Sequence, residues 1–142
     1  LIGGDMLLPE ISTYVGVSAM EPDANPLPQY LDSIARLTQL PDSTLVLPSH
    51  GRPFIGIAAR VAQLRAHHDV RLGQVLDACA TPHSAADLVP ALFPRPLDTR
   101  NYLLAIGETL AHLQALAGRA ALTRARGADG VIRFVRRTNK VH

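Results

Sequence analysis

Leu45-Val-Leu-Pro-Ser-His-Gly-Arg-Pro53 is a short apolar run that stops at a potential metal ligand, His50, beside a glycine. The chain opens in a similar way, because Leu1-Ile-Gly-Gly-Asp5 is another apolar run that stops at a polar side chain next to glycine. Strands that each deliver one polar side chain to their end are a common way to build a site on a rigid framework. Asp5 and His50 are therefore the two residues whose chemistry most needs an explanation.

The composition is typical of a globular protein that can bury a core, with 142 residues of which 47% are hydrophobic. No apolar run approaches the roughly 20 residues that cross a bilayer, and the start lacks the pattern of a secretory signal, so we expect a cytoplasmic protein without a membrane partner. The single cysteine, Cys79, lies in an apolar helical run and is expected to be a buried thiol rather than a nucleophile. Because Leu1 already lies inside an apolar run, we expect the chain to be part of a longer protein.

Basic charge is concentrated at the end of the chain. Residues 119–142 contain seven of the fourteen Arg and Lys residues and a single acid, Asp129. Such a segment can attract phosphate backbones or acidic surfaces. A solvated basic terminus is the simpler interpretation, and we favour it.

The first part of the chain has an α/β pattern. Residues 1–4 and 45–47 are predicted as short buried strands, the second ended by Pro48. The long proline-containing segment 6–25 shows no sustained period, although residues 11–17 could hold a short strand. Apolar residues then recur at helical spacing from Leu27 to Leu40. Strand, loop, helix and strand indicate an α/β segment.

The second part of the chain has the layout of a winged helix. A helix is predicted over residues 57–80, and Ser84 is expected to cap a short helix that ends near Pro90. Asp98 or Thr99 is expected to cap the next helix, which ends at Gly118. Its core stripe is predicted to be Leu103, Ile106, Leu110 and Leu113. Residues 120–125 and 131–135 then read as a β-hairpin.

These features resemble the C-terminal half of a metallo-β-lactamase-fold hydrolase. In that superfamily one strand ends in Gly-Asp and a later strand ends in Pro-x-His-Gly, which appear here as Gly4-Asp5 and Pro48-Ser-His-Gly51. The helical tail resembles the winged-helix domain of the subfamily related to β-lactamase-like endoribonucleases. The resemblance implies a remnant of the αββα metallo-β-lactamase fold at residues 1–56 and a winged-helix domain at residues 57–142.

The resemblance also implies a function for the two strand ends. Asp5 would be the carboxylate that bridges two zinc ions, and His50 would be an imidazole ligand of the second metal. The paired metals would activate a water as the nucleophile. The intact protein would hydrolyse an ester, thioester, lactone, amide or phosphodiester in a small molecule or an RNA.

The chain departs from the family pattern in its ligands. Family members need a His-x-His-x-Asp-His cluster and a further histidine, and this sequence has neither. His67 and His68 are not a substitute, since adjacent residues on a helix point about 100° apart. Two ligands do not make a tight zinc site. We therefore expect no catalytic residue and only weak or absent zinc binding in these 142 residues alone.

Simpler interpretations and one other class of function stay open. Asp5 could cap a turn and His50 could be an ordinary loop histidine. His68 is expected in the core, and His83 and His112 on the surface. Arg52 could reach an anionic substrate group or bond backbone carbonyls.

The alternative class is a winged-helix module that binds nucleic acid without enzymatic activity. The predicted recognition helix has few base-reading side chains, so we favour a packing, gating or dimerising role, including a homodimer. Weak contacts with phosphates would be made by the basic residues of the wing and tail, which are Arg119, Arg124, Arg126, Arg133, Arg136, Arg137 and Lys140.

Overall fold

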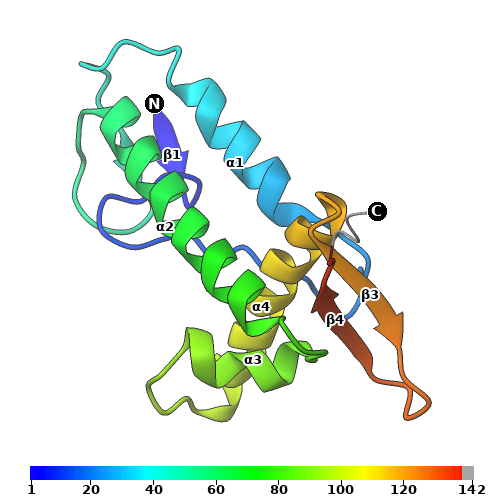
Figure 1. The fold of residues 1–142 in the computed structure, drawn as a ribbon. Coiled ribbons are helices and arrows are strands. Elements are labelled where there is room, and N and C mark those ends of the chain that lie inside the picture. Colours follow the sequence, from blue (N-terminus) through cyan, green and yellow to red (C-terminus); the bar gives the residue numbers. More distant parts are fainter. Residues whose placement is uncertain (139–142) are drawn as a thin grey trace. The chain divides into compact units, whose positions relative to one another are not determined.

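The computed structural model describes residues 1–138 and is mostly helical, with two small sheets (Figure 1). The chain forms two compact units. Unit 1 comprises Leu1–Tyr14 and Pro28–Asp69, and unit 2 comprises Val15–Leu27 and Val70–His142. The predicted boundary after residue 56 separates two domains defined by the family resemblance, whereas these units are defined by packing. That boundary stays a prediction. No helix in the described part of the chain is both long enough and apolar enough to cross a membrane.

Unit 1 contains a two-stranded parallel sheet. Strand β1 (Ile2–Gly4) pairs with β2 (Leu47–Pro48), with Ile2 opposite Leu47. The second strand begins later than expected, because the backbone N–H and C=O of Val46 bond instead to Phe54 at 2.7 and 3.1 Å. Pro48 lacks an N–H and the pairing ends with the bond from Ser49 N to Gly4 O, at 3.0 Å. Both predicted strands are thus present in shorter form, but the prediction that they are buried is wrong, since Ile2 is 86% and Leu47 45% exposed.

Helix α1 (Pro26–Leu37) has the predicted amphipathic character, with Tyr30, Leu31 and Ile34 buried. It ends three residues before the predicted Leu40. The amides of residues 38–40 bond the carbonyls three positions back, at 3.1 to 3.2 Å. Such bonds tighten the last turn of a helix before it stops.

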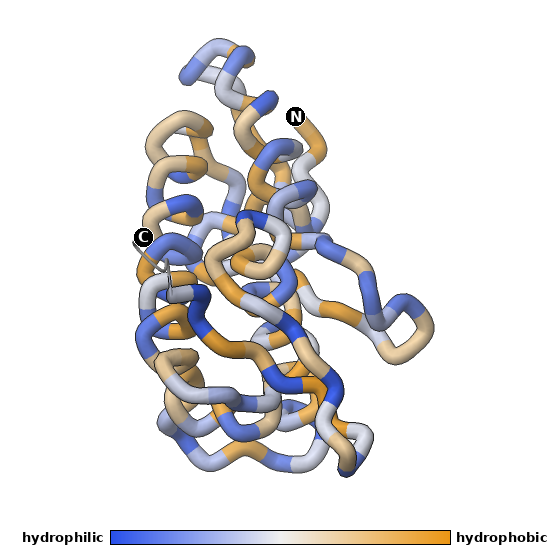
Figure 2. The backbone as a smooth tube through the Cα atoms, turned by 45° about the vertical axis from the view of Figure 1, so that its right-hand side comes forward, coloured by the Kyte–Doolittle hydropathy of each residue, from blue (hydrophilic) through white to orange (hydrophobic). Residues whose placement is uncertain are grey.

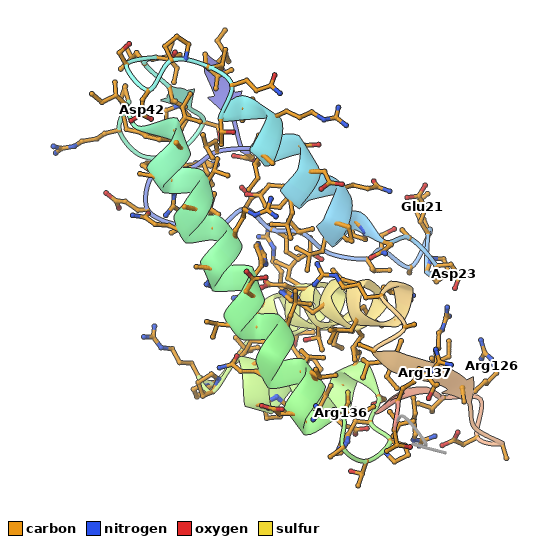
Figure 3. All side chains as sticks on the ribbon, turned by 45° about the horizontal axis from the view of Figure 1, so that its top comes forward. Glu21, Asp23, Asp42, Arg126, Arg136 and Arg137 are labelled. Carbon is orange, nitrogen blue, oxygen red and sulfur yellow. The ribbon has the colours of Figure 1, made fainter. Side chains whose placement is uncertain are left out.

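Helix α2 (Ile57–Ala78) contributes residues to both units. Asp42, labelled in Figure 3, holds its start: its Oδ1 accepts from the amide of Ala58 at 3.3 Å and its carbonyl accepts from Gly56 at 3.0 Å. The face of the helix within unit 1 is buried at Ile57, Val61, Leu64 and His68. The part within unit 2 buries Leu72 and Val75, and Cys79 just beyond the helix is fully buried, as predicted.

The segment 11–17 does not form the short strand that its alternation suggested. Val15 and Val17 are buried, so the apolar positions face a core. The segment makes one backbone bond rather than a ladder, from Val17 N to Gly107 O at 3.0 Å. A strand needs a partner strand, and the neighbouring element here is a helix.

Helix α3 (Ala85–Leu92) begins with the predicted capping box. The hydroxyl of Ser84 accepts from the amide of Asp87, and the Asp87 carboxylate accepts from the amide of Ser84 at 2.8 Å. The helix passes Pro90 by two residues, since the amide of Phe93 still bonds Val89 O at 2.8 Å. Arg71 stacks on Phe93, with its guanidinium carbon 4.6 Å from the ring centroid.

Helix α4 (Thr99–Gly118) is capped by Asp98, whose Oδ1 accepts from the amide of Asn101 at 2.7 Å. The predicted core stripe is wrong in part. Leu103 is 64% exposed, whereas Leu113 is fully buried. The buried face instead includes Thr109 and His112, because α4 packs against α3 and β3 and those neighbours determine which face is covered.

The predicted hairpin is present as antiparallel strands β3 (Leu122–Arg126) and β4 (Ile132–Arg136). Both strands mix hydrophobic and hydrophilic residues (Figure 2), and their buried positions are Leu122 and Phe134. Phe134 is 1% exposed, and its backbone N–H and C=O bond to His83 at 2.8 and 3.0 Å. Three helices followed by a hairpin is therefore the observed order.

Candidate metal site at two strand ends

Asp5 and His50 lie side by side directly after the two paired strands of unit 1. His50 Nε2 is 3.5 Å from Asp5 Oδ1, and the side chains are 68% and 65% exposed. The hydroxyl of Ser49 also donates to Asp5 Oδ1. Parallel pairing places the carboxyl ends of β1 and β2 at the same edge, so the residues that follow meet there.

Two glycines in the left-handed region give the backbone its turns at this edge. Gly4, before Asp5, has φ +50°, and Gly51, after His50, has φ +84°. A Cβ at Gly51 would come within 2.6 Å of Pro9 Cγ, so this position requires glycine for space as well as for conformation. The histidine loop thus lies against the loop that follows Asp5.

The loop after Asp5 is held by polar contacts from within unit 1. The hydroxyl of Thr13 donates to the carbonyl of Asp5, and the hydroxyl of Tyr30 donates to the carbonyl of Met6 at 3.3 Å. Burial raises the pKa of the Tyr30 phenol, against the opposing effects of a hydrogen bond with Thr13 and the charge of Arg60. Tyr30 therefore acts as a neutral donor.

A cavity of about 390 Å³ opens beside the Asp5–His50 pair. Its walls are Asp5, His50, Leu8 and residues 11–14. The volume falls in the range of about 300 to 1,000 Å³ typical of small-molecule sites. The two candidate ligands therefore border a space that a substrate could occupy.

The donor types at this edge fit zinc, but their number does not complete a site. Carboxylate oxygen and imidazole nitrogen are both zinc ligands, whereas a closed site takes four. Within residues 1–138, no group of three or more His, Cys, Asp and Glu side chains is arranged to hold a metal. Asp5 and His50 therefore match part of a ligand set.

The other histidines of residues 1–138 lie elsewhere. The rings of His67 and His68 on α2 meet edge to face, with centroids 5.2 Å apart, and His68 is 1% exposed, in the core as predicted. His112 was expected on the surface and is fully buried; its Nδ1 lies 2.8 Å from Glu108 O, so the helix itself provides a partner. His83 is half-buried, and its ring contacts lie at the surface.

Several of the basic residues on the hairpin are paired with carboxylates. Arg124 lies 2.6 Å from Asp23, and Arg133 makes two bonds to Asp129, at 3.0 and 2.7 Å. Arg136 is 3.8 Å from Asp77. Figure 3 labels Arg126, Arg136 and Arg137 on this part of the chain. Arg119 and Arg137 are exposed, Arg126 donates to Gly130 O at 2.7 Å, and Lys140 lies outside the described residues.

Sequence reasoning missed Arg60, a residue of α2 that bonds the loop beside the candidate ligands. Its Nε donates to Leu8 O at 2.7 Å and its Nη2 to Ile11 O at 2.9 Å. Both acceptors are backbone carbonyls, which every residue has, so no pattern of side chains could have signalled the contact. Ser49 was visible only as a neighbour of His50.

Comparison with known proteins gives the chain's relationships. Residues 72–137 match the family described as the metallo-beta-lactamase-like, C-terminal domain. A β-lactamase domain protein from Burkholderia ambifaria shares 54% sequence identity, with a TM-score of 0.93 over 96% of this chain and 41% of that chain. A metallo-β-lactamase family protein from Thermus thermophilus shares 34% identity, with a TM-score of 0.79 over the same fractions. No curated protein sequence matches the chain.

The expectation of a metallo-β-lactamase relationship is confirmed by these matches, whereas the endoribonuclease-related subfamily stays a prediction. The chain spans 41% of the length of each of the two solved relatives. Residues 72–137 are similar to a metallo-β-lactamase-like C-terminal domain, and over 96% of its length the chain has the fold of part of a metallo-β-lactamase family protein.

Proposed function

We propose that this chain is part of a metal-dependent hydrolase in which Asp5 and His50 supply two of the zinc ligands. The observation that carries the proposal is the 3.5 Å approach of His50 Nε2 to Asp5 Oδ1 at the ends of two paired strands. Both side chains are exposed beside a cavity, where a metal and a substrate can reach them. The relationship to metallo-β-lactamase proteins supports hydrolysis as the reaction class.

The residues of this chain would hold and orient the ligands. The Ser49 hydroxyl, which donates to Asp5 Oδ1, restricts the rotation of that carboxylate. The positive φ of Gly51 and its contact with Pro9 fix the loop that carries His50. Zinc bound there would lower the pKa of a coordinated water and supply a nucleophile at neutral pH. The substrate would be an ester, thioester, lactone, amide or phosphodiester.

The missing ligands would come from outside these 142 residues, because two donors do not close a zinc site. We therefore propose that the chain by itself is inactive and binds zinc weakly. The test is to extend the polypeptide upstream of Leu1 and measure bound zinc and hydrolysis. The proposal predicts an upstream His-x-His-x-Asp-His cluster, stoichiometric zinc, and loss of both zinc and activity in Asp5→Asn. An upstream region without that cluster, or full activity in Asp5→Asn, would overturn it.

We also infer that the three helices and the hairpin constitute a winged helix, on the basis of their order and the short glycine-containing turn at Gly127 and Gly130. Nucleic-acid binding by this part of the chain is the second candidate function, supported by the exposed Arg119 and Arg137. The ion pairs of Arg124 and Arg133 weigh against it, since they reduce the charge left for phosphates. Salt-dependent retention on RNA, abolished in an Arg119→Gln/Arg137→Gln variant, would support it. Equal retention of that variant would exclude this surface.

A further inference from the structure

The cavity beside Asp5 and His50 has an apolar wall that is exposed in this structure. Ile11 is 60% exposed and Tyr14 is 49% exposed, while Leu8 is 3% exposed beneath them. All three residues line the cavity of about 390 Å³. Asp5 and His50 also line the cavity and form the candidate metal edge. The cavity therefore combines a reactive edge with an apolar surface for a ligand.

Arg60 holds that wall in place. Its guanidinium donates from Nε to Leu8 O at 2.7 Å and from Nη2 to Ile11 O at 2.9 Å. The third contact, from Nη1 to the Gln63 side-chain oxygen at 3.1 Å, fixes the guanidinium against its own helix. A planar fork that bonds two carbonyls of one loop restricts that loop more than a single bond would. The bond from Arg60 to the carbonyl of Ile11 thus keeps the Ile11 side chain at the cavity.

Residues 12–14 are tied back to the candidate ligand loop. The hydroxyl of Thr13 donates to the carbonyl of Asp5, so the segment that carries Tyr14 is bonded to the residue after β1. The loop is therefore anchored at Leu8, Ile11 and Thr13. Large apolar side chains held exposed beside a cavity are typical of ligand sites, because the ligand covers them on binding.

We propose that this cavity binds an alkyl or aryl group of the substrate, with Ile11 and Tyr14 as specificity-determining residues and Arg60 as a positioning residue. The inference rests on the proposed function for the identity of the reacting edge. It adds the substrate class, which is an ester, thioester, amide or phosphodiester that carries an apolar substituent next to the bond that is cleaved. A substrate with a charged group at that position would leave the apolar wall uncovered and would be disfavoured.

Binding of a neutral probe to the metal-free 142-residue chain tests the cavity directly. N-hexylacetamide is a suitable probe, because it pairs an amide with an alkyl chain and cannot be confused with a metal ligand. We expect chemical shift changes at the Ile11 methyl groups and at the amides of residues 11–14 in a nuclear magnetic resonance titration. The variant Ile11→Ser should bind the probe about fivefold or more weakly, since it loses apolar contact area.

The matched control is Ile55→Ser, because Ile55 is 63% exposed in the same unit and lines none of the cavities described. It should leave probe affinity unchanged. Equal weakening in Ile11→Ser and Ile55→Ser, no probe binding at all, or shift changes confined to other residues would each overturn the proposal.

The role of Arg60 is tested by Arg60→Met, which keeps much of the side-chain length but removes the donors. We expect faster amide hydrogen exchange in the loop and about threefold or more weaker probe binding, with partial rescue in Arg60→Lys. Arg65→Met, an exposed change on the same helix, is the control. Unchanged exchange and unchanged affinity in Arg60→Met would show that Arg60 does not position the wall.

A kinetic comparison separates this inference from the proposed function. In the upstream-extended protein, Ile11→Ser should lower kcat/KM for a hexanoyl thioester more than for an acetyl thioester. Equal effects on both substrates would overturn the apolar subsite and leave the hydrolase standing. Probe binding to the metal-free chain, without any zinc-dependent hydrolysis by the extended protein, would support the apolar subsite and overturn the proposed hydrolase function.

Discussion

His50 Nε2 lies 3.5 Å from Asp5 Oδ1, although the two residues are separated in sequence by a loop, helix α1 and strand β2. The approach follows from parallel pairing of β1 with β2, which brings both strand ends to one edge. Neither residue is buried by its neighbours, so the contact is available to a metal ion and to solvent. This arrangement places a carboxylate and an imidazole together beside a cavity.

The tight fit of Gly51 against Pro9 leads to a prediction about stability. Gly51→Ala should destabilise unit 1 because alanine would combine an unfavourable φ of +84° with a 2.6 Å clash. Gly56→Ala provides a matched control, since Gly56 has φ +90° but no atom within 4 Å of its added Cβ. We expect a loss of about 1 kcal/mol for Gly56→Ala from conformation and about 1 to 3 kcal/mol more for Gly51→Ala from crowding. Urea unfolding measures the free energy of unfolding of both variants. Equal losses of stability would contradict the close packing of Gly51 against Pro9.

The bidentate pair of Asp129 and Arg133 predicts a pH effect in the hairpin. Hydrogen bonds from Arg133 lower the pKa of the Asp129 carboxyl to about 2. A folded-state pKa below the unfolded value gives stabilisation that is present above about pH 4 and is lost as the pH falls through about 2. The carboxyl carbon of Asp129 should titrate near pH 2 in the folded protein. In Arg133→Met the midpoint should rise toward 3.8, and an unchanged midpoint would exclude Arg133 as the cause.

Glu108 should have the opposite effect on how stability depends on pH. Burial raises the pKa of its carboxyl above the usual 4.5, and the charge of Arg71 only partly offsets this effect. A raised folded-state pKa gives stability that is fully present below the unfolded pKa and is lost as the pH rises through the folded pKa. Glu108→Gln should therefore gain stability relative to the original chain between pH 4 and pH 7. Glu21→Gln, a change of an exposed carboxylate in the same unit, should show no such gain, and thermal unfolding across pH would compare the two.

Local interactions were the part of the fold that could be predicted from the sequence. Ser84 and Asp87 form a capping box because the partners are three residues apart, and no tertiary information is needed. The strand ends at Asp5 and His50 could be recognised because apolar runs stop there beside glycine. The pairing that brings those ends together was implied by the family resemblance rather than by the residues.

Tertiary contacts decided the features that could not be predicted. On α4 the apolar Leu103 is exposed and the polar Thr109 is fully buried, because packing against α3 and β3 decides which face is covered. The Thr109 hydroxyl tolerates burial because it donates to Ala105 O at 2.7 Å. His112 is buried in the same way, with Glu108 O as its partner. Arg60 binds carbonyls far away in sequence, which leave no trace in a side-chain pattern. The metal-binding role of Asp5 and His50 stays a prediction.

A zinc titration of the 142-residue chain, followed through the imidazole nitrogen shifts of its six histidines, tests the central claim most directly. We predict weak binding that shifts the ring of His50 first and that weakens further in Asp5→Asn, because the two side chains form half of a site. Shifts at other histidines while His50 is unaffected, or tight stoichiometric binding that is the same in Asp5→Asn, would contradict it.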